Sequence, residues 1–236
     1  MTKILAFRLW GDYAHFKKYY TTTSPLTFEI PPPPTLIGII SAIIGLDKDE
    51  YLSFFQNNDE YKLAICLDKP VKKVRWSLNL IDTKKHFWII HNRTQIRTEF
   101  LKDASYIIYC QHTNSDIYNR LKKHLQNHES VYSISLGLSE LLANYEFLGE
   151  MEYEFNTSTD WINLNSVLPY SQLLNDNSID FGIDQEIFKI NYPIMMDTER
   201  IVHKRDDIIF ERNAKPVRCR VKQFAETEKG DKIVFI

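Results

Sequence analysis

The sequence has little of several features that define common protein classes. Its 236 residues contain only 7 glycines and 3 cysteines, and the longest apolar run, Leu36 to Leu46, is too short to span a membrane. It contains no glycine-rich dinucleotide motif, phosphate-binding loop or serine-hydrolase elbow, so these enzyme classes have no support. Neither sign of charge dominates, because the formal net charge is −2. Any nucleic-acid site must therefore be a local patch rather than a global attraction.

The cysteines and the N-terminus indicate where the protein resides. Cys66, Cys110 and Cys219 stand alone in apolar stretches, which predicts reduced, buried thiols. Arg8 and Asp12 interrupt the segment in which a secretion signal would need its apolar core, so we expect no such signal. Together these features predict a cytoplasmic protein without membrane contact.

A metal site and a cofactor are both unsupported. His124 and His128 have the i, i+4 spacing of two zinc ligands, but no glutamate lies between them and no cysteine cluster accompanies them. We interpret the pair as an exposed helix face and expect neither metal nor cofactor.

The segment from Phe7 to Leu46 carries the strongest local signals. Strand periodicity ends at Gly11, an aromatic and basic loop follows, and four prolines precede a helix that begins near Thr35. Small residues at i, i+3, i+4 and i+7 of this helix form a stripe that another backbone can approach closely, with the last suited to a C-cap. This stripe consists of Gly38, Ser41, Ala42 and Gly45.

The rest of the chain alternates between strand and helix signals. Strands are expected at 61–67, 71–81, 106–111, 131–136 and 145–155, and a helix is expected at 115–127 with a short helical piece at 139–144. In the expected strand 71–81, Lys73 and Arg75 lie on one side, and Trp76 lies on the other side with three aliphatic residues. We expect this strand to form a hairpin with 86–91 as its second arm. Such an order predicts an α+β fold of the ferredoxin-like, RNA-recognition type with an inserted ribbon.

We expect two regions. A first domain at 1–155 contains the ribbon at about 71–100, and a small β-rich C-terminal region follows at 156–236, after a polar segment without periodicity. A strand at 217–223 in that region has a basic face.

Several motifs resemble one known family. The first motif comprises Ala14-His15-Phe16, then Ser24-Pro25-Leu26-Thr27-Phe28-Glu29-Ile30-Pro31-Pro32, and the helix from Gly38 to Gly45. The second motif runs from Arg97 to Asp103 and leads to Tyr106 and Tyr109. The third motif, Leu136 to Glu140, reads L-G-L-S-E. This wording resembles the CRISPR-associated protein 5 family of the repeat-associated mysterious protein (RAMP) superfamily, over roughly residues 3–150.

The resemblance implies a function. It implies a RAMP domain with a thumb, acting as a non-catalytic subunit of a type I interference complex (Cascade), of the I-B branch by length and by Thr94 to Arg97. Such a subunit binds the repeat-derived 5′ handle of the CRISPR guide RNA (crRNA). It caps the complex, contacting a backbone RAMP subunit and the large PAM-reading subunit, and meets target DNA only indirectly.

Three stretches mix cations with aromatic rings, as RNA sites do: 8–20, 72–97 and 200–222. Each stretch alone also fits a solvated face with half-buried tyrosines. Taken with the resemblance, the predicted RNA-binding residues are Arg8, His15, Lys17, Lys18, Tyr19, Thr35, Arg93, Gln95 and Arg97. The predicted contacts of the thumb with the backbone subunit are Lys73, Arg75, Trp76, Lys84, Lys85 and His86. The first turn of the helix at Thr35 is expected to direct free N–H groups toward the RNA.

Two other functions stay open. One branch of the family cuts precursor crRNA without metal, and His15, His91, Lys17 and Tyr19 supply candidate acids and bases. However, Ile43 and Ile44 stand where that branch places its tyrosine, and no matching Lys-His pair is found. The other alternative is a scaffold that binds only protein, for which purified protein would carry no nucleic acid.

Overall fold

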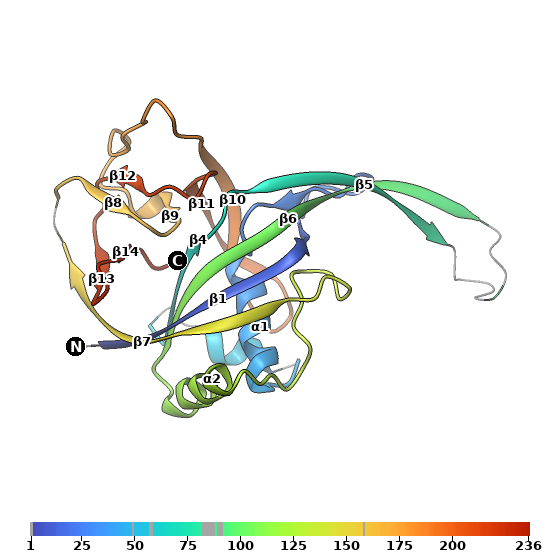
Figure 1. Ribbon diagram of the computed structural model, residues 1–236, viewed down its shortest axis with the longest axis horizontal. Coiled ribbons are helices and arrows are strands. Elements are labelled where there is room, and N and C mark those ends of the chain that lie inside the picture. Colours follow the sequence, from blue (N-terminus) through green and yellow to red (C-terminus); the bar gives the residue numbers. More distant parts are fainter. Residues whose placement is uncertain (1, 49, 57–58, 82–87, 89–91, 158) are drawn as a thin grey trace.

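A large antiparallel sheet forms the centre of the molecule in the computed structural model, which describes residues 2–48, 50–56, 59–81, 88, 92–157 and 159–236. Within this part, the chain is mostly β with two α-helices, which lie together below the sheet in Figure 1. The strands of the large sheet are β1 (Thr2–Ala14), β4 (Tyr61–Leu67), β5 (Lys72–Ile81), β6 (Arg93–His112), β7 (Asn144–Asn156), β13 (Phe224–Thr227) and β14 (Lys232–Ile233). The helices are α1 (Pro33–Ile44) and α2 (Ser115–Asn127), with 3₁₀ turns η1 (Tyr51–Phe55) and η2 (Tyr170–Gln172).

Smaller sheets complete the fold. They pair β2 (Phe16–Lys17) with β3 (Thr27–Phe28), β8 (Ile162–Leu164) with β12 (Val217–Cys219), and β10 (Ile187–Met196) with β11 (Val202–Glu211) and β9 (Leu168–Pro169). The large sheet has the order β14-β13-β7-β1-β6-β4, with β5 paired to β6. Its central four strands and two helices follow one another along the chain as β1-α1-β4-β6-α2-β7.

Helix α1 forms where the sequence predicts it. Pro33 and Pro34 occupy its first turn, and Gly45 ends it in the left-handed conformation at φ 73°. The small-residue stripe also behaves as predicted, because the N–H groups of Val131 and Tyr132 donate to the carbonyls of the last turn at 3.1 and 3.0 Å. Nine of its twelve residues are buried. No helix in the described residues combines the length and hydropathy needed to cross a membrane.

That close approach corrects one prediction. Residues 131–136 were expected as a strand and 139–144 as a short helix, but the structure has neither. The segment instead caps α1 with its N–H groups and forms one isolated bridge, Ser135 to Leu142. Its alternating apolar residues face the core from a loop, since Ile134 and Leu136 are buried.

A two-stranded ribbon projects from the body (Figure 1). It consists of β5 and the first half of β6, paired from Lys72 with Lys102 to Ile81 with Arg93. The predicted return arm, 86–91, lies outside the described residues apart from Trp88, and the described return arm begins at Arg93. We call β5 and Arg93–Lys102 the ribbon.

The C-terminal region shares the large sheet. Strand β13 pairs with β7, and the chain end reaches the opposite edge, where the N–H of Ile236 donates to the carbonyl of Leu63 at 2.9 Å. From β10, Tyr192 enters the main core, where its hydroxyl accepts a hydrogen bond from the N–H of Ile30 at 3.1 Å. The division at residue 155 into two domains stays a prediction. The three cysteines are free and buried, as predicted.

Candidate nucleic-acid interface

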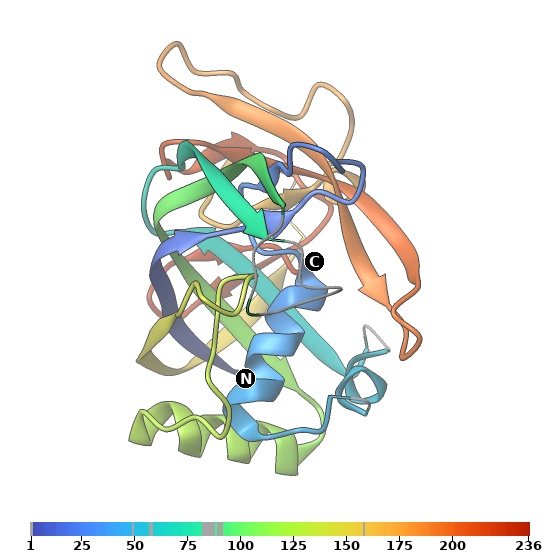
Figure 2. The same ribbon diagram turned by 90° about the vertical axis from the view of Figure 1, so that its right-hand side faces the viewer.

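The loop between β1 and α1 is the point at which two of the aromatic and basic stretches, and part of the third, meet. Tyr13, near the end of β1 where this loop begins, packs edge-on against Trp76 of the ribbon, with ring centroids 4.4 Å apart. On its other side, the guanidinium of Arg205 in β11 lies 3.9 Å from the ring centre of Tyr19. Figure 2 shows this loop between the ribbon and the β10–β11 hairpin, with α1 below. Segments nearly 200 residues apart in the chain therefore form one side of the molecule.

Two buried carboxylates hold the root of the ribbon to this loop. Glu99 accepts from the ammonium of Lys73 at 3.0 Å and from the guanidinium of Arg75 at 3.1 and 3.2 Å. Glu29 lies 2.6 Å from the same ammonium and 3.5 Å from that of Lys18. These five side chains form the root network.

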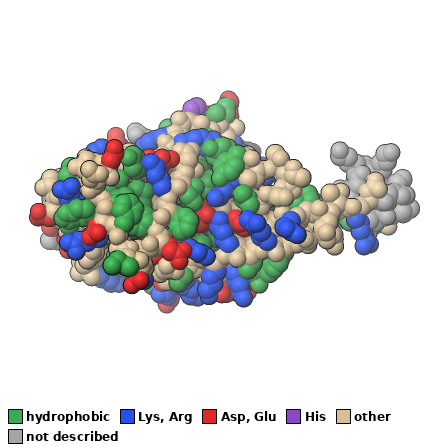
Figure 3. Space-filling view, turned by 90° about the horizontal axis from the view of Figure 1, so that it is seen from above, with side chains coloured by type: hydrophobic (Ala, Val, Ile, Leu, Met, Phe, Trp, Pro, Cys, Tyr) green, Lys and Arg blue, Asp and Glu red, His purple; other side chains and the backbone are tan. Residues whose placement is uncertain are grey.

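The root network shifts two pKa values in the direction of mutual stabilisation. Burial alone would lower the pKa of Lys73, but hydrogen bonds and charge from Glu29 and Glu99 outweigh it and raise that pKa. Burial likewise opposes ionisation of Glu99, yet Lys73 and Arg75 lower the pKa of that carboxyl below its usual value. The cations here are therefore neutralised, and Figure 3 shows Lys and Arg interspersed with Asp and Glu where the ribbon begins.

This arrangement corrects the predicted roles of His15 and Lys18. His15 is 4% exposed, and its Nδ1 forms a hydrogen bond with the backbone carbonyl oxygen of Glu99 at 2.7 Å. Lys18 is 8% exposed, and its ammonium lies near Glu29 and over the ring of Phe28. Both side chains stabilise the fold and offer no accessible surface to RNA.

The prediction of free N–H groups at the start of α1 is also wrong. Pro33 and Pro34 have no N–H group, and the N–H groups of Thr35 and Leu36 both donate to the carbonyl of Pro32, at 2.8 and 3.1 Å. Thr35 itself is half-buried and lines a groove described below.

Arg8 is engaged elsewhere. It lies on β1 between Phe7 and Leu9, which face the helices, so its side chain is on the opposite face of the sheet. There it forms ion pairs with Asp68 and Glu146, at 3.2 and 2.5 Å. The structure does not bring it together with the loop residues.

The ribbon keeps its predicted two-sided character. The register places Arg93, Gln95 and Arg97 on one face, opposite Ile81, Asn79 and Ser77. All three predicted side chains are exposed, and neither arginine has a carboxylate partner within the described residues. The other face carries Trp76, which is 42% exposed, together with Val74, Leu78 and Leu80.

The predicted contacts at the ribbon therefore divide into three groups. Lys73 and Arg75 belong to the root network, and Trp76 lies on the apolar face. Lys84, Lys85 and His86 lie outside the described residues.

Exposed rings and cations flank the ribbon. Tyr19 and Tyr20 are 54% and 58% exposed and meet edge-on. Lys17 is exposed and has no ion-pair partner in the described part of the chain. Tyr20 and Arg205 lie within the predicted stretches 8–20 and 200–222 but are not among the predicted RNA-binding residues. The contact of Arg205 with Tyr19 depends on the tertiary fold.

A groove of about 480 Å³ runs beside α1. Gly38 and Ala42 of the small-residue stripe lie along it, Ser135 lies opposite, and Arg200 stands at its rim in the β10–β11 turn. Arg200 has a left-handed backbone at φ 64° and is exposed. The lining of the groove offers a cation and hydroxyl groups, a combination that suits a nucleic-acid backbone.

The last part of the third stretch, 200–222, does not contribute. Arg218 pairs with Asp180, Arg220 lies over Trp161, and Lys222 donates to the carbonyl of Ser171. Only 217–219 of the predicted strand 217–223 form a strand, β12, and the cations of this segment interact within the C-terminal region. No group of three metal-binding side chains occurs among the described residues.

Comparisons with known proteins concern the family and the fold. Residues 4–152 match the sequence family described as CRISPR-associated protein (Cas_Cas5). A CRISPR protein from Archaeoglobus fulgidus is similar in structure, with a TM-score of 0.53, 14% identity, and coverage of 99% of this chain and 97% of that one. A chain of a CRISPR RNA-guided surveillance complex has a TM-score of 0.50, 12% identity, and coverage of 91% of each chain. At these identities the structural likeness concerns the fold. No curated protein matches the sequence.

Proposed function

The chain belongs to the CRISPR-associated Cas5 family, and from this premise we propose that it is a non-catalytic subunit of a type I interference complex that holds the 5′ handle of the crRNA. Its partners in this proposal are the crRNA, a backbone RAMP subunit and the large PAM-reading subunit. The element order β1-α1-β4-β6-α2-β7 supports a ferredoxin-like RAMP domain with the ribbon as its thumb. The I-B subtype rests on the sequence resemblance alone.

The observation that carries the proposal is a set of exposed rings, and of cations without a carboxylate partner in the described residues, on the loop, the ribbon and the β10–β11 hairpin of a protein whose net charge is −2. This surface, which we call the RNA surface, comprises Lys17, Tyr19, Tyr20, Arg93, Gln95, Arg97, Arg200 and Arg205. Arginine and lysine neutralise phosphates, and tyrosine faces stack on splayed bases. The root network keeps other cations away from the RNA and fixes the angle of the ribbon.

The apolar face of the ribbon has a different role. Trp76, Leu78 and Leu80 line one side of a strand pair that extends beyond the core. We assign this face to the neighbouring backbone subunit, because exposed contiguous apolar side chains on a projecting element mark protein interfaces.

Binding of handle RNA tests the proposal. Each arginine that contacts a phosphate contributes about 0.7 to the slope of log affinity against log salt for single strands. The double variant Arg93→Ala/Arg97→Ala is therefore expected to bind handle RNA about tenfold more weakly, with a slope shallower by about 1.4. The matched control Lys123→Ala/Arg218→Ala also removes two charges, but from α2 and β12, and is expected to bind like the parent protein.

Two results would oppose the proposal. Equal affinity and slope in the ribbon variant and its control would remove the ribbon from the RNA surface. Purified protein free of nucleic acid and unable to bind handle RNA at low salt would favour a scaffold that contacts protein only.

Precursor cleavage is scored in the same samples. Among the candidate acids and bases, His15 is buried against Glu99, and Tyr19 is an exposed ring that lies against the guanidinium of Arg205 with no acid or base beside it in the described residues. We therefore expect repeat-containing precursor RNA to be bound and left intact in chelator, whereas defined cleavage products would establish the endoribonuclease alternative.

A further inference from the structure

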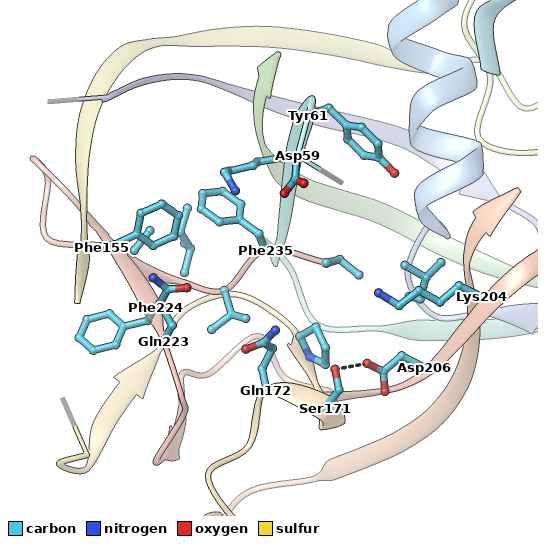
Figure 4. Close-up of a pocket in the computed structure, with 17 residues that line it drawn as sticks. Asp59, Tyr61, Phe155, Ser171, Gln172, Lys204, Asp206, Gln223, Phe224 and Phe235 are labelled. Carbon is cyan, nitrogen blue, oxygen red and sulfur yellow. Dashed lines mark hydrogen bonds between the residues drawn. The ribbon is translucent and has the colours of Figure 1, made fainter. Parts of the chain in front are cut away.

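A second recessed site lies away from the RNA surface. A pocket of about 220 Å³ opens between β4, β11, η2 and the chain end, and Figure 4 shows its lining. Along β11, Lys204 faces this pocket whereas the next residue, Arg205, meets Tyr19, so the strand separates the two sites.

Aromatic rings form one wall of the pocket. Phe155 and Phe235 lie edge-on with centroids 5.8 Å apart, and the ammonium of Lys62 lies 5.3 and 5.6 Å from their centres. Phe155 is 44% exposed, so part of the residue is accessible from solvent. Such a ring offers a planar ligand a stacking surface.

Polar groups without partners converge on the same space. Within the described residues, the side-chain amides of Gln172 and Gln223 and the ammonium of Lys204 make no hydrogen bond or ion pair. In Figure 4 the amide of Gln172 and the ammonium of Lys204 point into the space before Phe235. They come from three separate elements, so a ligand between them would satisfy donors and acceptors that the fold leaves unused.

The charges of the lining select the chemistry of the ligand. Two lysines, Lys62 and Lys204, are balanced by two carboxylates, Asp59 and Asp206, the latter accepting a hydrogen bond from Ser171. A polyphosphate or a cationic side chain would meet as much repulsion as attraction, whereas a neutral planar group would not. The volume is below that of common small-molecule pockets, which suits one group of a polymer rather than a whole metabolite.

We propose that this pocket binds a single unstacked nucleobase of a single-stranded nucleic acid, stacked on Phe155, with Gln172 and Gln223 at its edge and Lys204 near the adjoining phosphate. Side-chain amides pair with base edges because they carry both hydrogen-bond donors and acceptors. One lysine can bind one phosphate without giving the site an affinity for polyanions in general. The site adds a nucleic-acid contact outside the RNA surface and does not depend on the ribbon.

Short photoreactive oligonucleotides test the site. The probes are a tetramer of 4-thiouridine RNA and a tetramer of 4-thiothymidine DNA, added to the full chain carrying Arg93→Ala/Arg97→Ala so that the ribbon does not contribute. Irradiation and mass spectrometry are expected to place crosslinks on peptides that contain Phe155 or Phe235. Comparison of the two probes decides whether the base belongs to RNA or DNA.

Two variants measure the contribution of the pocket. Phe155→Leu keeps an apolar side chain but removes the stacking ring, and is expected to weaken tetramer binding about tenfold. Lys204→Ala changes an exposed side chain and is expected to weaken binding a few-fold with a salt slope shallower by about 0.7. The control Phe188→Leu alters a ring of β10 that is outside the pocket and is expected to have no effect.

The outcomes separate this site from the proposed function. Crosslinks confined to other peptides, or unchanged tetramer binding in both pocket variants, would overturn the pocket assignment. Loss of all tetramer binding in the ribbon variant would overturn it as well. Pocket crosslinks in a protein that fails to bind handle RNA would leave the pocket in place and overturn the proposed function instead.

Discussion

Replacing Glu99 by glutamine tests whether the root network holds the ribbon to the body. The side chain of Glu99 is 6% exposed, and those of Lys73 and Arg75 are 29% and 61% exposed. A hydrogen bond to a charged group contributes about 1.5–3 kcal/mol, and an exposed pair contributes about 1 kcal/mol at most. Because Lys73 is partly solvated and keeps Glu29 at 2.6 Å, we expect Glu99→Gln to lower the free energy of unfolding by about 2 kcal/mol.

Urea unfolding and thermal melting measure this change. For a chain of this size about 2 kcal/mol corresponds to a decrease in Tm of about 4–8 °C. Hydrogen exchange should also accelerate in Arg93–Leu101, where the ribbon leaves the body. The matched control is Asp103→Asn, which removes the carboxylate of an exposed pair with Lys72 and should change stability by less than about 0.5 kcal/mol.

The pH dependence follows from the pKa shifts. The pKa of Glu99 is lowered in the folded protein, so its contribution is complete above the unfolded value of about 4.3 and is lost as pH falls through the folded pKa. The pKa of Lys73 is raised, so its contribution is complete below about pH 10.4 and is lost as pH rises through the folded value. The stability difference between parent and Glu99→Gln should therefore be constant near neutrality and shrink in acid. A difference no larger than that of Asp103→Asn at pH 7 would refute the reasoning.

Three further changes probe the scaffold. Gly137 has φ 101°, and a Cβ there would lie 1.9 Å from the carbonyl oxygen of His15, so Gly137→Ala should lower Tm far more than Gly230→Ala, which has open space at φ 85°. Tyr192→Phe removes the hydroxyl that accepts from the buried N–H of Ile30, and it should lower the free energy of unfolding in urea by about 1–3 kcal/mol. A decrease of less than about 0.5 kcal/mol would show that another group accepts that hydrogen bond. Burial raises the pKa of all three thiols, to about 12 for two of them, so a thiol reagent at pH 8 should label none in the native protein and three after unfolding; rapid native labelling would contradict the buried placement. These thiols are Cys66, Cys110 and Cys219.

Elements with local signals could be predicted from the sequence. The prolines and Gly45 define α1, and α2 and β4 occupy the predicted residues 115–127 and 61–67. In each case one side packs on the core, so burial imposes a period of 3.6 or 2 on the side chains.

The second strand of the ribbon has no such period. Residues 93–97 are exposed or half-buried because the ribbon projects into solvent, so their side chains carry no burial signal. For this reason the sequence showed a weakly periodic segment before a strand at 106–111, where the structure has one strand of 20 residues. Residues 131–136 gave the opposite error, because alternating apolar side chains can also face a core from a loop that caps a helix.

The site was harder to predict, since the availability of a cation depends on distant carboxylates. The sequence predicts that Lys18 binds RNA and that Lys73 contacts the backbone subunit, yet Glu29 and Glu99 neutralise these two lysines in the fold. Arg205 becomes part of the RNA surface only because β11 crosses the loop at Tyr19. Neither fact has a signature in local sequence.

The motifs that carry the family resemblance explain why the fold could be predicted from the sequence better than the site. Thr27 and Glu29 belong to the first motif, and Glu99 belongs to the second. The carboxylate of Glu99 accepts from the N–H of Thr27 at 3.4 Å and from the ammonium of Lys73 at 3.0 Å, and the same ammonium pairs with Glu29. The third motif contributes Gly137, whose missing Cβ lets the carbonyl of His15 approach.

These motif residues therefore join the loop, the ribbon root and the core. A resemblance built on them predicts the scaffold well and says little about which side chains meet RNA. The arginines of the RNA surface have no internal carboxylate partner in the described residues, so the fold leaves them free to vary with the nucleic acid that is bound. Handle affinity should accordingly depend on Arg93, Arg97 and Arg205 rather than on the motifs, and exchanging these three between family members should transfer the strength of handle binding and its salt dependence while leaving Tm unchanged.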